Sequence, residues 1–259
     1  MKTNNLGYPR IGSNRELKKA NELYWAGKIS AENLLAAGSI IRKENWKLQA
    51  ENGMDLIPSN DISLYDQVLD LTLTLGAIPE RYQDFAKTNN SLDLYFAMAR
   101  GVQKAGQDLV AMEMTKWFDT NYHYIVPEFT KNQKFEWFST KVIAEFIEAK
   151  TLGIITTPVL IGPVSYLLLG KEKGDGFYRI ELIHNLLPVY FEILNKLQAE
   201  GATYIQLDEP FLALNLTDKE RGTITYVYNE INKNFPSLKI ILANYFDCFG
   251  ENLKTALAL

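Results

Sequence analysis

Short apolar, β-prone segments alternate with longer helical patterns along this 259-residue chain, and the alternation constrains the fold more than any other feature. It favours a parallel sheet covered by helices, because each helix returns the chain to the edge where the next strand begins. We predict six strand-then-helix units. Their strands are expected at residues 6–9, 55–58, 121–126, 157–161, 204–207 and 239–243.

Helix caps and apolar spacing place the intervening helices. Ser13 and Glu16 have the Ser-x-x-Glu spacing of a capping box, which predicts a first helix that ends near residue 25. Ser30 is the predicted cap of a second helix that runs to residue 52. Pro188 lies inside a further predicted helix, where we expect a kink or break. The remaining helices are expected at residues 63–75, 135–149, 176–200 and 217–234, and from about residue 251.

Six such units are compatible with two architectures. They could form an open, doubly wound sheet, or three quarters of an eight-stranded (β/α)8 barrel. The phosphate-binding motifs G-x-G-x-x-G and G-x-x-x-x-G-K-S/T do not occur in the sequence, which removes the commonest use of the open sheet. Residues 253–259 have the pattern of a helix interior without a cap or polar tail. We therefore expect an α/β fold that is cut from something longer, and the residues alone leave both architectures open.

Composition argues against several classes of function. A formal net charge of −4 argues against a general affinity for nucleic acid, which requires a basic surface. No run of about 18 apolar residues is present, so the sequence predicts no membrane span. The single cysteine, Cys248, rules out an intrachain disulfide and fits a reducing, cytoplasmic location. Cys248, His123 and His184 lie far apart, so a cysteine-rich zinc site is excluded and a mixed site has no spacing signature.

Basic residues form the first candidate site. Arg15, Lys18 and Lys19 stand at positions i, i+3 and i+4 of the first predicted helix, so they share one face near its amino end. Free amide groups and the helix dipole favour anions at that end, and Arg10 lies just upstream. The cluster could receive a ligand rich in carboxylates or phosphates. The alternative is a solvated basic face without a ligand.

Aromatic residues beside a lysine form the second candidate. Lys116 is followed by Trp117, Phe118 and Asp119, and residues 121–124 add two tyrosines and a histidine. A positive charge next to flat apolar surfaces suits a planar ring with an anionic tail. The alternative is an amphipathic segment whose aromatic side chains belong to the core.

Carboxylates follow two of the predicted strands. Asp208 and Glu209 come directly after the strand at 204–207 and so lie at its carboxyl end, where the active sites of parallel α/β proteins collect. They could act as acid and base or bind a ligand, or Asp208 could cap the turn before the following proline. Asp61 and Asp66, with a tyrosine between them, follow the strand at 55–58 in the same way, and loop capping is the alternative there.

Eight segments of the chain, in the same order and over nearly its whole length, match one known family. They are residues 6–12 (LGYPRIG), 14–19 (NRELKK), 24–29 (YWAGKI), 61–66 (DISLYD), 75–81 (LGAIPER), 111–124 (AMEMTKWFDTNYHY), 162–165 (GPVS) and 206–210 (QLDEP). Together these segments resemble the opening part of the cobalamin-independent methionine synthases. The block at 111–124 is highly specific by itself.

The resemblance implies a function for a protein longer than this chain. The family transfers a methyl group from 5-methyltetrahydropteroyltri-L-glutamate to L-homocysteine, which gives L-methionine without cobalamin. Its members have two barrel domains, and the zinc ion that activates the homocysteine thiol belongs to the carboxyl-terminal barrel. Residues 1–259 would then be the amino-terminal barrel domain, an α/β fold of the (β/α)8 barrel type truncated after about six units. This domain would pack against its own carboxyl-terminal barrel and be inactive alone. The alternative is a stand-alone folate-binding module without catalysis.

The resemblance also implies which residues bind the folate. The family's Arg-Glu-Leu-Lys stretch corresponds to Arg15, Glu16, Leu17 and Lys18, and the lysine before its Trp-Phe-Asp-Thr stretch corresponds to Lys116. This assignment agrees with the basic cluster, since a polyglutamate tail is a string of carboxylates. The resemblance assigns no catalytic and no metal-binding residue to this chain.

Overall fold

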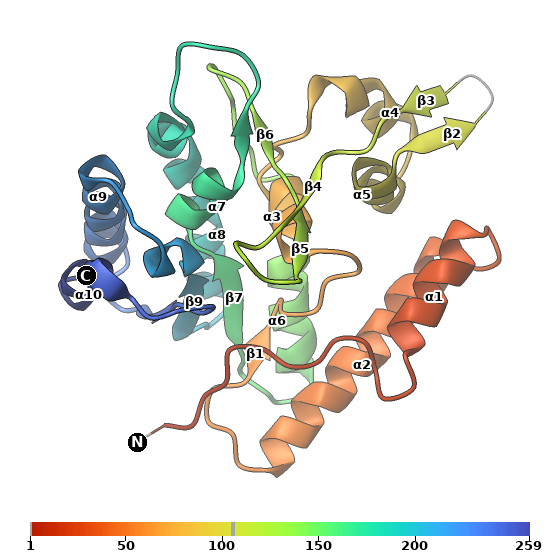
Figure 1. Ribbon diagram of the computed structural model, residues 1–259. Helices are drawn as coiled ribbons and strands as arrows, with labels where there is room; N and C mark the ends of the chain where they lie inside the picture. Colours follow the sequence, from red (N-terminus) through yellow and green to blue (C-terminus); the bar gives the residue numbers. More distant parts are fainter. Residues whose placement is uncertain (1, 105–106) are drawn as a thin grey trace. The chain divides into compact units, whose positions relative to one another are not determined.

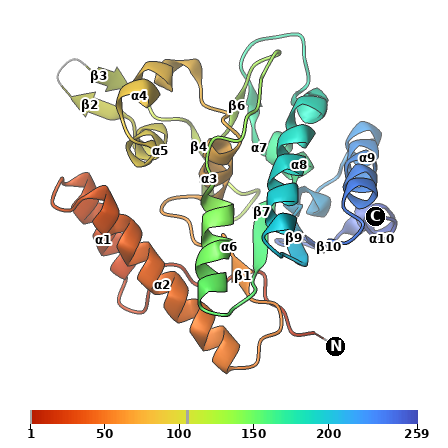
Figure 2. The ribbon, with the colours of Figure 1, turned by 180° about the vertical axis from the view of Figure 1, so that it is seen from behind.

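The computed structural model describes residues 2–104 and 107–259, and the chain forms two compact units. The first unit comprises the described residues up to Leu64 and the segment Lys141–Val159. The second comprises the described residues of Tyr65–Thr140 and Leu160–Leu259. Figure 1 labels the elements of both units, and Figure 2 shows the same ribbon from behind.

The first unit contains a pair of long helices and the beginning of a parallel sheet. Its elements are α1 (Glu16–Trp25), α2 (Ala31–Glu51), β1 (Pro58–Ser59), α6 (Lys141–Thr151) and the first three residues of β7 (Thr157–Ile161). Both views show α1 lying along α2 (Figures 1 and 2). β1 pairs in parallel with β7, and Pro58 stands opposite Thr157. Just upstream, Asn4 and Leu56 form an isolated parallel bridge.

The second unit contains the rest of the sheet, most of the helices and three small two-stranded sheets. Its elements are α3 (Gln67–Thr74), η1 (Glu80–Tyr82), α4 (Gln83–Thr88), α5 (Ser91–Arg100), β2 (Val102–Lys104), β3 (Gln107–Leu109), β4 (Met114–Lys116), β5 (His123–Ile125), β6 (Glu128–Phe129), the end of β7, α7 (Pro163–Leu169), β8 (Lys171–Glu172), η2 (Arg179–Leu182), α8 (Ile183–Ala199), β9 (Tyr204–Asp208), η3 (Pro210–Ala213), α9 (Asp218–Asn234), β10 (Lys239–Ala243), η4 (Gly250–Asn252) and α10 (Leu253–Leu257), where η denotes a short 3-10 helix. The pairs β2–β3 and β4–β5 are antiparallel, and β6–β8 is parallel.

The main sheet confirms the predicted α/β class. Its strands follow the order β1-β7-β9-β10, and β9 pairs in parallel with β10 along their whole length. The spatial order repeats the chain order, as in a singly wound (β/α)8 barrel, whereas a doubly wound sheet reverses direction at a switch point. The strand order therefore favours the barrel type of winding over the open sheet.

Two of the six predicted strands do not belong to this sheet. Among the described residues, 6–9 form no strand. The strand predicted at 121–126 is β5, which pairs with β4 in an antiparallel hairpin instead of entering the parallel sheet. The Trp117 N–H donates to the Tyr122 carbonyl oxygen at 2.8 Å and closes the hairpin. A turn this short returns the chain beside itself, and only an antiparallel pair permits that.

The helix predictions have mixed outcomes. The Ser30 cap of α2 is confirmed, since its hydroxyl accepts the Asn33 N–H at 3.3 Å. Of the kink or break predicted at Pro188, the break does not occur, because α8 runs through that residue. The helix predicted at 135–149 begins only at residue 141, because the Glu136 and Phe138 N–H groups bond to backbone carbonyls at the end of α3. Among the described residues, no helix is both long and apolar enough to cross a membrane.

The capping box predicted at Ser13 is also wrong. Arg15 is the N-cap of α1, with φ 62° and ψ 37°, and no side-chain hydrogen bond caps the helix. The Glu16 carboxylate instead accepts the Asn14 N–H at 3.0 Å and the Asn14 side-chain amide at 3.2 Å. A capping box does occur at α9, between Thr217 and Glu220.

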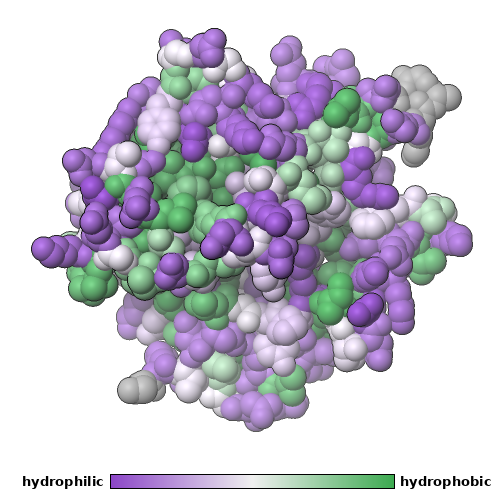
Figure 3. Space-filling model, in the orientation of Figure 1, coloured by the Kyte–Doolittle hydropathy of each residue, from purple (hydrophilic) through white to green (hydrophobic). Residues whose placement is uncertain are grey.

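Apolar side chains fill the interior of each unit. Among the described residues of the first unit, Leu17 clusters with Ile41 and Ile62, and Trp46 clusters with Ile57 and Ala149. On the face drawn in Figure 3, hydrophilic residues are interspersed with smaller apolar areas. Figure 3 thus shows the mixed surface that the ordinary composition of the chain predicts.

Trp46 provides a test of this core. Its side chain is only 1% exposed, and the indole N–H donates to the Pro58 carbonyl oxygen of β1 at 3.0 Å. Trp46→Ala should lower the free energy of unfolding by about 3–5 kcal/mol, because it leaves a cavity and an unpaired carbonyl. Leu35→Ala, at a position on the same helix that is 51% exposed, should change it by less than about 0.5 kcal/mol. Urea unfolding of both variants measures the difference, and equal losses would contradict the assignment of this core.

Candidate functional site

The start of α1 has an unusual backbone. Arg15 adopts a left-handed conformation, which costs a non-glycine residue about 1–2 kcal/mol. Three residues earlier Gly12 has φ 79°, and a Cβ at that position would overlap the Glu16 carboxylate. The Leu17 N–H donates to the Ile11 carbonyl oxygen at 3.2 Å, so the chain itself uses one amide of the first helical turn. Positive charge at this end therefore comes chiefly from side chains.

The predicted folate-binding residues at the start of α1 are consecutive in the sequence but differ in their exposure to solvent. Arg15 and Lys18 are exposed, and Lys18 forms a solvated ion pair with Glu22 at 3.8 Å. Leu17 is buried in the core, where its side chain packs against other apolar groups. Glu16 is exposed, and hydrogen bonds from its own N–H and from Asn14 lower the pKa of its carboxyl group. The side chains that a ligand can reach are therefore the two cations and the carboxylate of Glu16.

Two further basic residues of the predicted cluster have different environments. Lys19 is exposed on α1, one residue beyond Lys18. The Arg10 guanidinium donates to the Ser63 carbonyl oxygen, so Arg10 fixes the loop before the helix. Arg10 is itself exposed, so it combines this structural contact with its place in the predicted basic cluster.

Lys116 belongs to the second unit. It is the last residue of β4, stands opposite His123 across the hairpin, and is exposed. The next residue, Trp117, is buried and packs against Tyr124, with 4.9 Å between the ring centroids. Phe118 has a left-handed backbone with φ 50° and forms an edge contact with Phe211 at 5.2 Å. Trp117 and Phe118 thus pack against other rings, whereas Tyr122 is exposed, and Lys116 is an exposed cation of the segment.

Glu209, at the end of β9, is fully buried and has a structural role. Its carboxylate accepts the Ser165 N–H at 2.7 Å and the Val164 N–H at 3.4 Å, at the start of α7, and the Tyr228 hydroxyl at 3.2 Å. Burial raises the pKa of Glu209 to about 7. Because this carboxylate satisfies the first backbone N–H groups of a helix, it acts as a cap supplied from a distant part of the sequence.

Asp208 and Asp66 are buried in the same way. Asp208 accepts a hydrogen bond from the Gln206 amide at 2.8 Å and another from the Tyr245 hydroxyl at 3.3 Å. Asp66 caps α3 and also accepts the Ile125 N–H of β5 at 2.9 Å. Burial raises the pKa of each of these two carboxyl groups to about 7. Asp66 therefore confirms the loop-capping alternative.

Several partners of these carboxylates could not be predicted from the sequence. Ser165 lies 44 residues before Glu209, and Tyr245 lies 37 residues after Asp208. A spacing pattern within one helix or strand cannot identify such pairs. Only the packing of helices around the sheet brings them together.

The described residues do not fit a metal centre. They bring together no group of three histidine, cysteine or carboxylate side chains that could hold an ion. His184 is exposed and forms an edge contact with Tyr226 at 5.4 Å, while Cys248 is an exposed free thiol.

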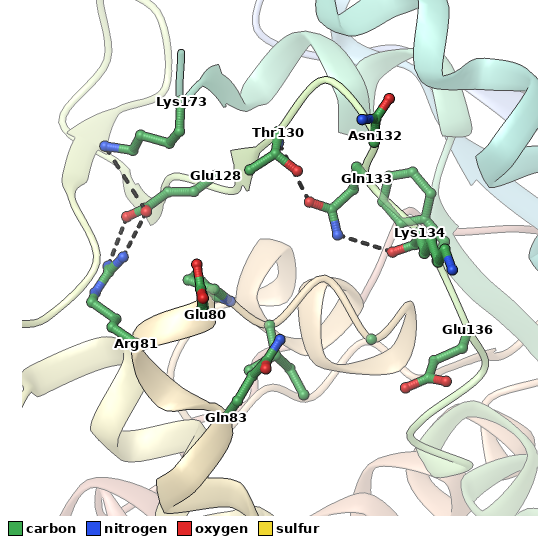
Figure 4. Close-up of a pocket in the computed structure, with 14 residues that line it drawn as sticks. Glu80, Arg81, Gln83, Glu128, Thr130, Asn132, Gln133, Lys134, Glu136 and Lys173 are labelled. Atoms are coloured by element: carbon green, nitrogen blue, oxygen red, sulfur yellow. Dashed lines mark hydrogen bonds and ion pairs between the residues drawn. The ribbon is translucent and has the colours of Figure 1, made fainter.

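A polar cavity of about 840 Å³ opens in the second unit, beside η1 and the β6 segment (Figure 4). Arg81 forms a two-pronged ion pair with Glu128, with both hydrogen bonds at 2.7 Å, and Lys173 approaches the same carboxylate at 3.9 Å. The Gln133 side chain donates to the Lys134 carbonyl oxygen. Because these polar groups pair with one another, we assign no ligand to the cavity.

Comparison with known proteins identifies close relatives. Residues 2–259 match the family model described as "Cobalamin-independent synthase, N-terminal domain". A protein of Flavobacterium johnsoniae named 5-methyltetrahydropteroyltriglutamate–homocysteine methyltransferase is 79% identical over 100% of this chain, and a Cytophaga hutchinsonii protein of the same name is 58% identical over 100%. Each alignment covers 34% of the relative, so the chain spans about a third of the length of these proteins.

Solved structures share the fold at low sequence identity. A structure titled as a putative vitamin-B12 independent methionine synthase from Listeria monocytogenes superposes with a TM-score of 0.56 and 14% identity. The alignment covers 97% of this chain and 67% of that one. At such identity the likeness supports the α/β fold and no more.

The buried carboxyl groups predict a pH dependence of stability. Asp66, Asp208 and Glu209 have pKa values raised to about 7, whereas carboxyl groups in unfolded chains titrate near 4. Between about pH 4 and 7 the folded protein therefore binds more protons than the unfolded chain. Its free energy of unfolding should fall as the pH rises through this window, by up to about 1.4 kcal/mol per pH unit for each group, and then level off.

Asp208→Asn should make this slope shallower, because it removes one titrating group. Urea unfolding at about pH 5, 6, 7 and 8 measures the slope of the wild type and the variant. Asp84→Asn is the control, since Asp84 is exposed and its hydrogen bond to Lys87 lowers its pKa. An unchanged slope in Asp208→Asn would show that Asp208 is ionised throughout the window.

Proposed function

Because the chain belongs to the family of cobalamin-independent synthase N-terminal domains, we propose that it binds the folate substrate of a methionine synthase. The complete enzyme would transfer the methyl group of 5-methyltetrahydropteroyltri-L-glutamate to L-homocysteine. Curated relatives that are 79% and 58% identical carry the corresponding name, and the chain spans about a third of their length. These relatives favour a part of a longer enzyme over a stand-alone folate-binding module.

The exposed cations at the start of α1 are the observation on which the binding proposal rests. Arg15 and Lys18 are one turn apart, and both side chains are open to solvent. A triglutamate tail presents several carboxylates in a row, and charge-assisted hydrogen bonds to such groups are the stronger kind. The guanidinium of Arg15 can bind one carboxylate with two N–H groups, whereas Lys18 offers a single mobile charge.

Two of the other predicted binding residues, Leu17 and Glu16, have indirect roles in this proposal, whereas Lys116 has a direct one. Leu17 anchors the first turn of α1 in the core, and Glu16 holds the preceding loop through Asn14. Lys116 supplies a third exposed cation, from the β4–β5 hairpin. We propose that Arg15, Lys18 and Lys116 contact the glutamate tail and not the pterin ring.

The methyl transfer itself is assigned to the rest of the complete enzyme, a carboxyl-terminal barrel packed against residues 1–259 as the amino-terminal barrel domain. A zinc ion bound there would lower the pKa of the homocysteine thiol and favour the nucleophilic thiolate. The residues described here do not fit that ion, so we derive no step through it. A cytoplasmic location agrees with the exposed free thiol of Cys248, which a reducing compartment preserves.

The tail-binding proposal predicts a change in substrate preference. The wild-type complete enzyme should have a lower KM for the triglutamate substrate than for the monoglutamate, and rising salt should reduce this preference. Arg15→Ala combined with Lys18→Ala should remove most of the preference and leave the monoglutamate KM unchanged. A loss of about tenfold corresponds to one charge-assisted contact of about 1.4 kcal/mol. Lys116→Ala alone should have a smaller effect, in the range of about 0.2–1 kcal/mol for an exposed pair.

A matched control is Lys28→Ala combined with Lys47→Ala. Both lysines are exposed in the first unit, outside the start of α1. This control removes the same net charge and should leave the tail preference intact. Equal losses for both substrates in the Arg15/Lys18 variant would show that these residues hold the ring or the fold, which would contradict the proposal.

The proposal also predicts that purified residues 1–259 form no detectable methionine, even with zinc added. The physical reason is that the described residues bring together no group of metal ligands, so they could hold no ion that activates a thiol. Incubation with methyl-folate triglutamate and homocysteine, followed by quantification of methionine, measures this. Turnover that increases with protein concentration would overturn the assignment of chemistry to the rest of the enzyme.

A further inference from the structure

The loop formed by residues 60–64 follows β1 and binds the segment that leads into α1. The Asp61 carboxylate accepts the Tyr8 N–H at 2.8 Å, and burial raises the pKa of Asp61. The Ser63 carbonyl oxygen accepts a hydrogen bond from the Arg10 guanidinium. The 60–64 loop therefore fixes the chain at two points, five and seven residues before Arg15.

The same loop also contacts α1 itself. Ile62 packs against Leu17 in an apolar cluster of the first unit. The Leu64 carbonyl oxygen accepts the side-chain amide of Asn21 at 2.7 Å. Leu17 and Asn21 are one helical turn apart on the buried side of α1. These two contacts therefore set the rotation of α1 about its own axis and its position along that axis. The directions in which Arg15 and Lys18 project follow from that setting.

Asn60 fixes the position of the loop. Its backbone is left-handed, with φ 63°, a conformation that asparagine tolerates better than most residues. Its N–H donates to the Glu145 carboxylate at 3.1 Å, and its side-chain amide donates to the Val159 carbonyl oxygen of β7 at 2.8 Å. Its side-chain oxygen accepts a hydrogen bond from the Lys141 ammonium group at 2.8 Å. One residue thus joins β1 to β7 and to α6.

The partners of Asn60 are themselves held in place. The Glu145 side chain is only 5% exposed and forms ion pairs with Lys141 at 3.1 Å and with Arg42 of α2 at 3.5 Å. Arg42 also donates two hydrogen bonds to Glu148, at 2.9 and 2.7 Å. A buried charge network of this kind is costly to disturb, so it gives Asn60 a rigid support.

We infer that Asn60 is a positioning residue for recognition of the glutamate tail: it fixes the 60–64 loop, which sets the place of Arg15 and Lys18. The inference rests on the proposed function, since it requires those two cations to bind the tail. Asn60 acts through them and does not contact the substrate. An error in placement of about 1 Å weakens a charge-assisted hydrogen bond considerably, because such bonds depend on both distance and angle.

Asn60→Gly tests the inference in the complete enzyme. Glycine accepts the left-handed backbone without strain, so the change removes the two side-chain hydrogen bonds and little else. The triglutamate KM should rise about three- to tenfold, because misplaced charge-assisted contacts lose only part of their energy. The monoglutamate KM and kcat should stay within about twofold of the wild-type values, since neither depends on the tail contacts.

A double-mutant cycle separates positioning from general damage. When Arg15 and Lys18 are both replaced by alanine, Asn60→Gly should cause no further loss of tail preference, because the groups it positions are gone. A merely structural effect would lower activity toward both substrates and would add to the effect of the alanine variant. Additive losses would therefore overturn the inference.

Two further variants guard against misinterpretation. Asn60→Ser is the second variant in case Asn60→Gly does not fold: it adds no charge beside Glu145, but its side chain is too short to reach both Lys141 and Val159, so it should also lose tail preference. Asn52→Gly is the matched control, because Asn52 also donates its side-chain amide to a backbone carbonyl, that of Leu48 at 2.7 Å. No described contact joins Asn52 to residues 60–64, and its replacement should leave the tail preference unchanged.

The outcomes distinguish this inference from the proposed function. If the Arg15/Lys18 variant loses the tail preference and the Asn60 variants keep it, the inference is wrong and the binding site stands. If the Arg15/Lys18 variant keeps the preference, the binding site is wrong and the inference is overturned with it. If the Arg15/Lys18 variant and the Asn60 variants each lose the tail preference, and their effects are not additive, the result supports the binding site and the inference.

Discussion

Buried carboxylates that accept backbone N–H groups make the turns at the strand ends possible in both units. Glu145 accepts the N–H of Asn60 directly after β1, and Glu209 accepts the N–H of Ser165 just after β7. An unpaired buried N–H costs about as much as a lost hydrogen bond, and the chain must bury several where it leaves a sheet. The loops that these carboxylates fix then determine where the neighbouring helices begin.

This constraint changes how the acidic residues of the chain are interpreted. Carboxylates at the carboxyl ends of parallel strands are typical of active sites. Here Glu209 and Asp66 each bind the N–H groups of a helix start, and burial raises the pKa of each to about 7. Raised pKa values also occur in catalytic groups, but their hydrogen-bond partners point to a structural role for these two. Exposed charge at the start of α1 is then the better candidate for ligand contact.

The sequence predicted much of the fold because local patterns carry it. The bounds of β7 and β10 were predicted correctly from continuous apolar runs, and Ser30 was predicted correctly as a cap because its partner lies only three residues away. The sequence also identified the family through short segments spread along the chain. For the candidate site, the sequence placed basic residues at the start of α1, where Lys18 and Lys19 are exposed, but Arg15 is the N-cap and not a residue inside the helix.

What the sequence by itself determined is the α/β class, the order of its main elements and the presence of basic residues at the start of α1. The cap of α1 is Arg15 in place of the expected Ser13 box, and the Glu16 carboxylate binds Asn14, so this difference arises from local contacts. Tertiary structure alone decided that Arg10 donates to the Ser63 carbonyl oxygen. It also decided that Leu17 is core. The physical reason is the same in each case: the partner is supplied by a segment distant in sequence, and local spacing contains no information about it.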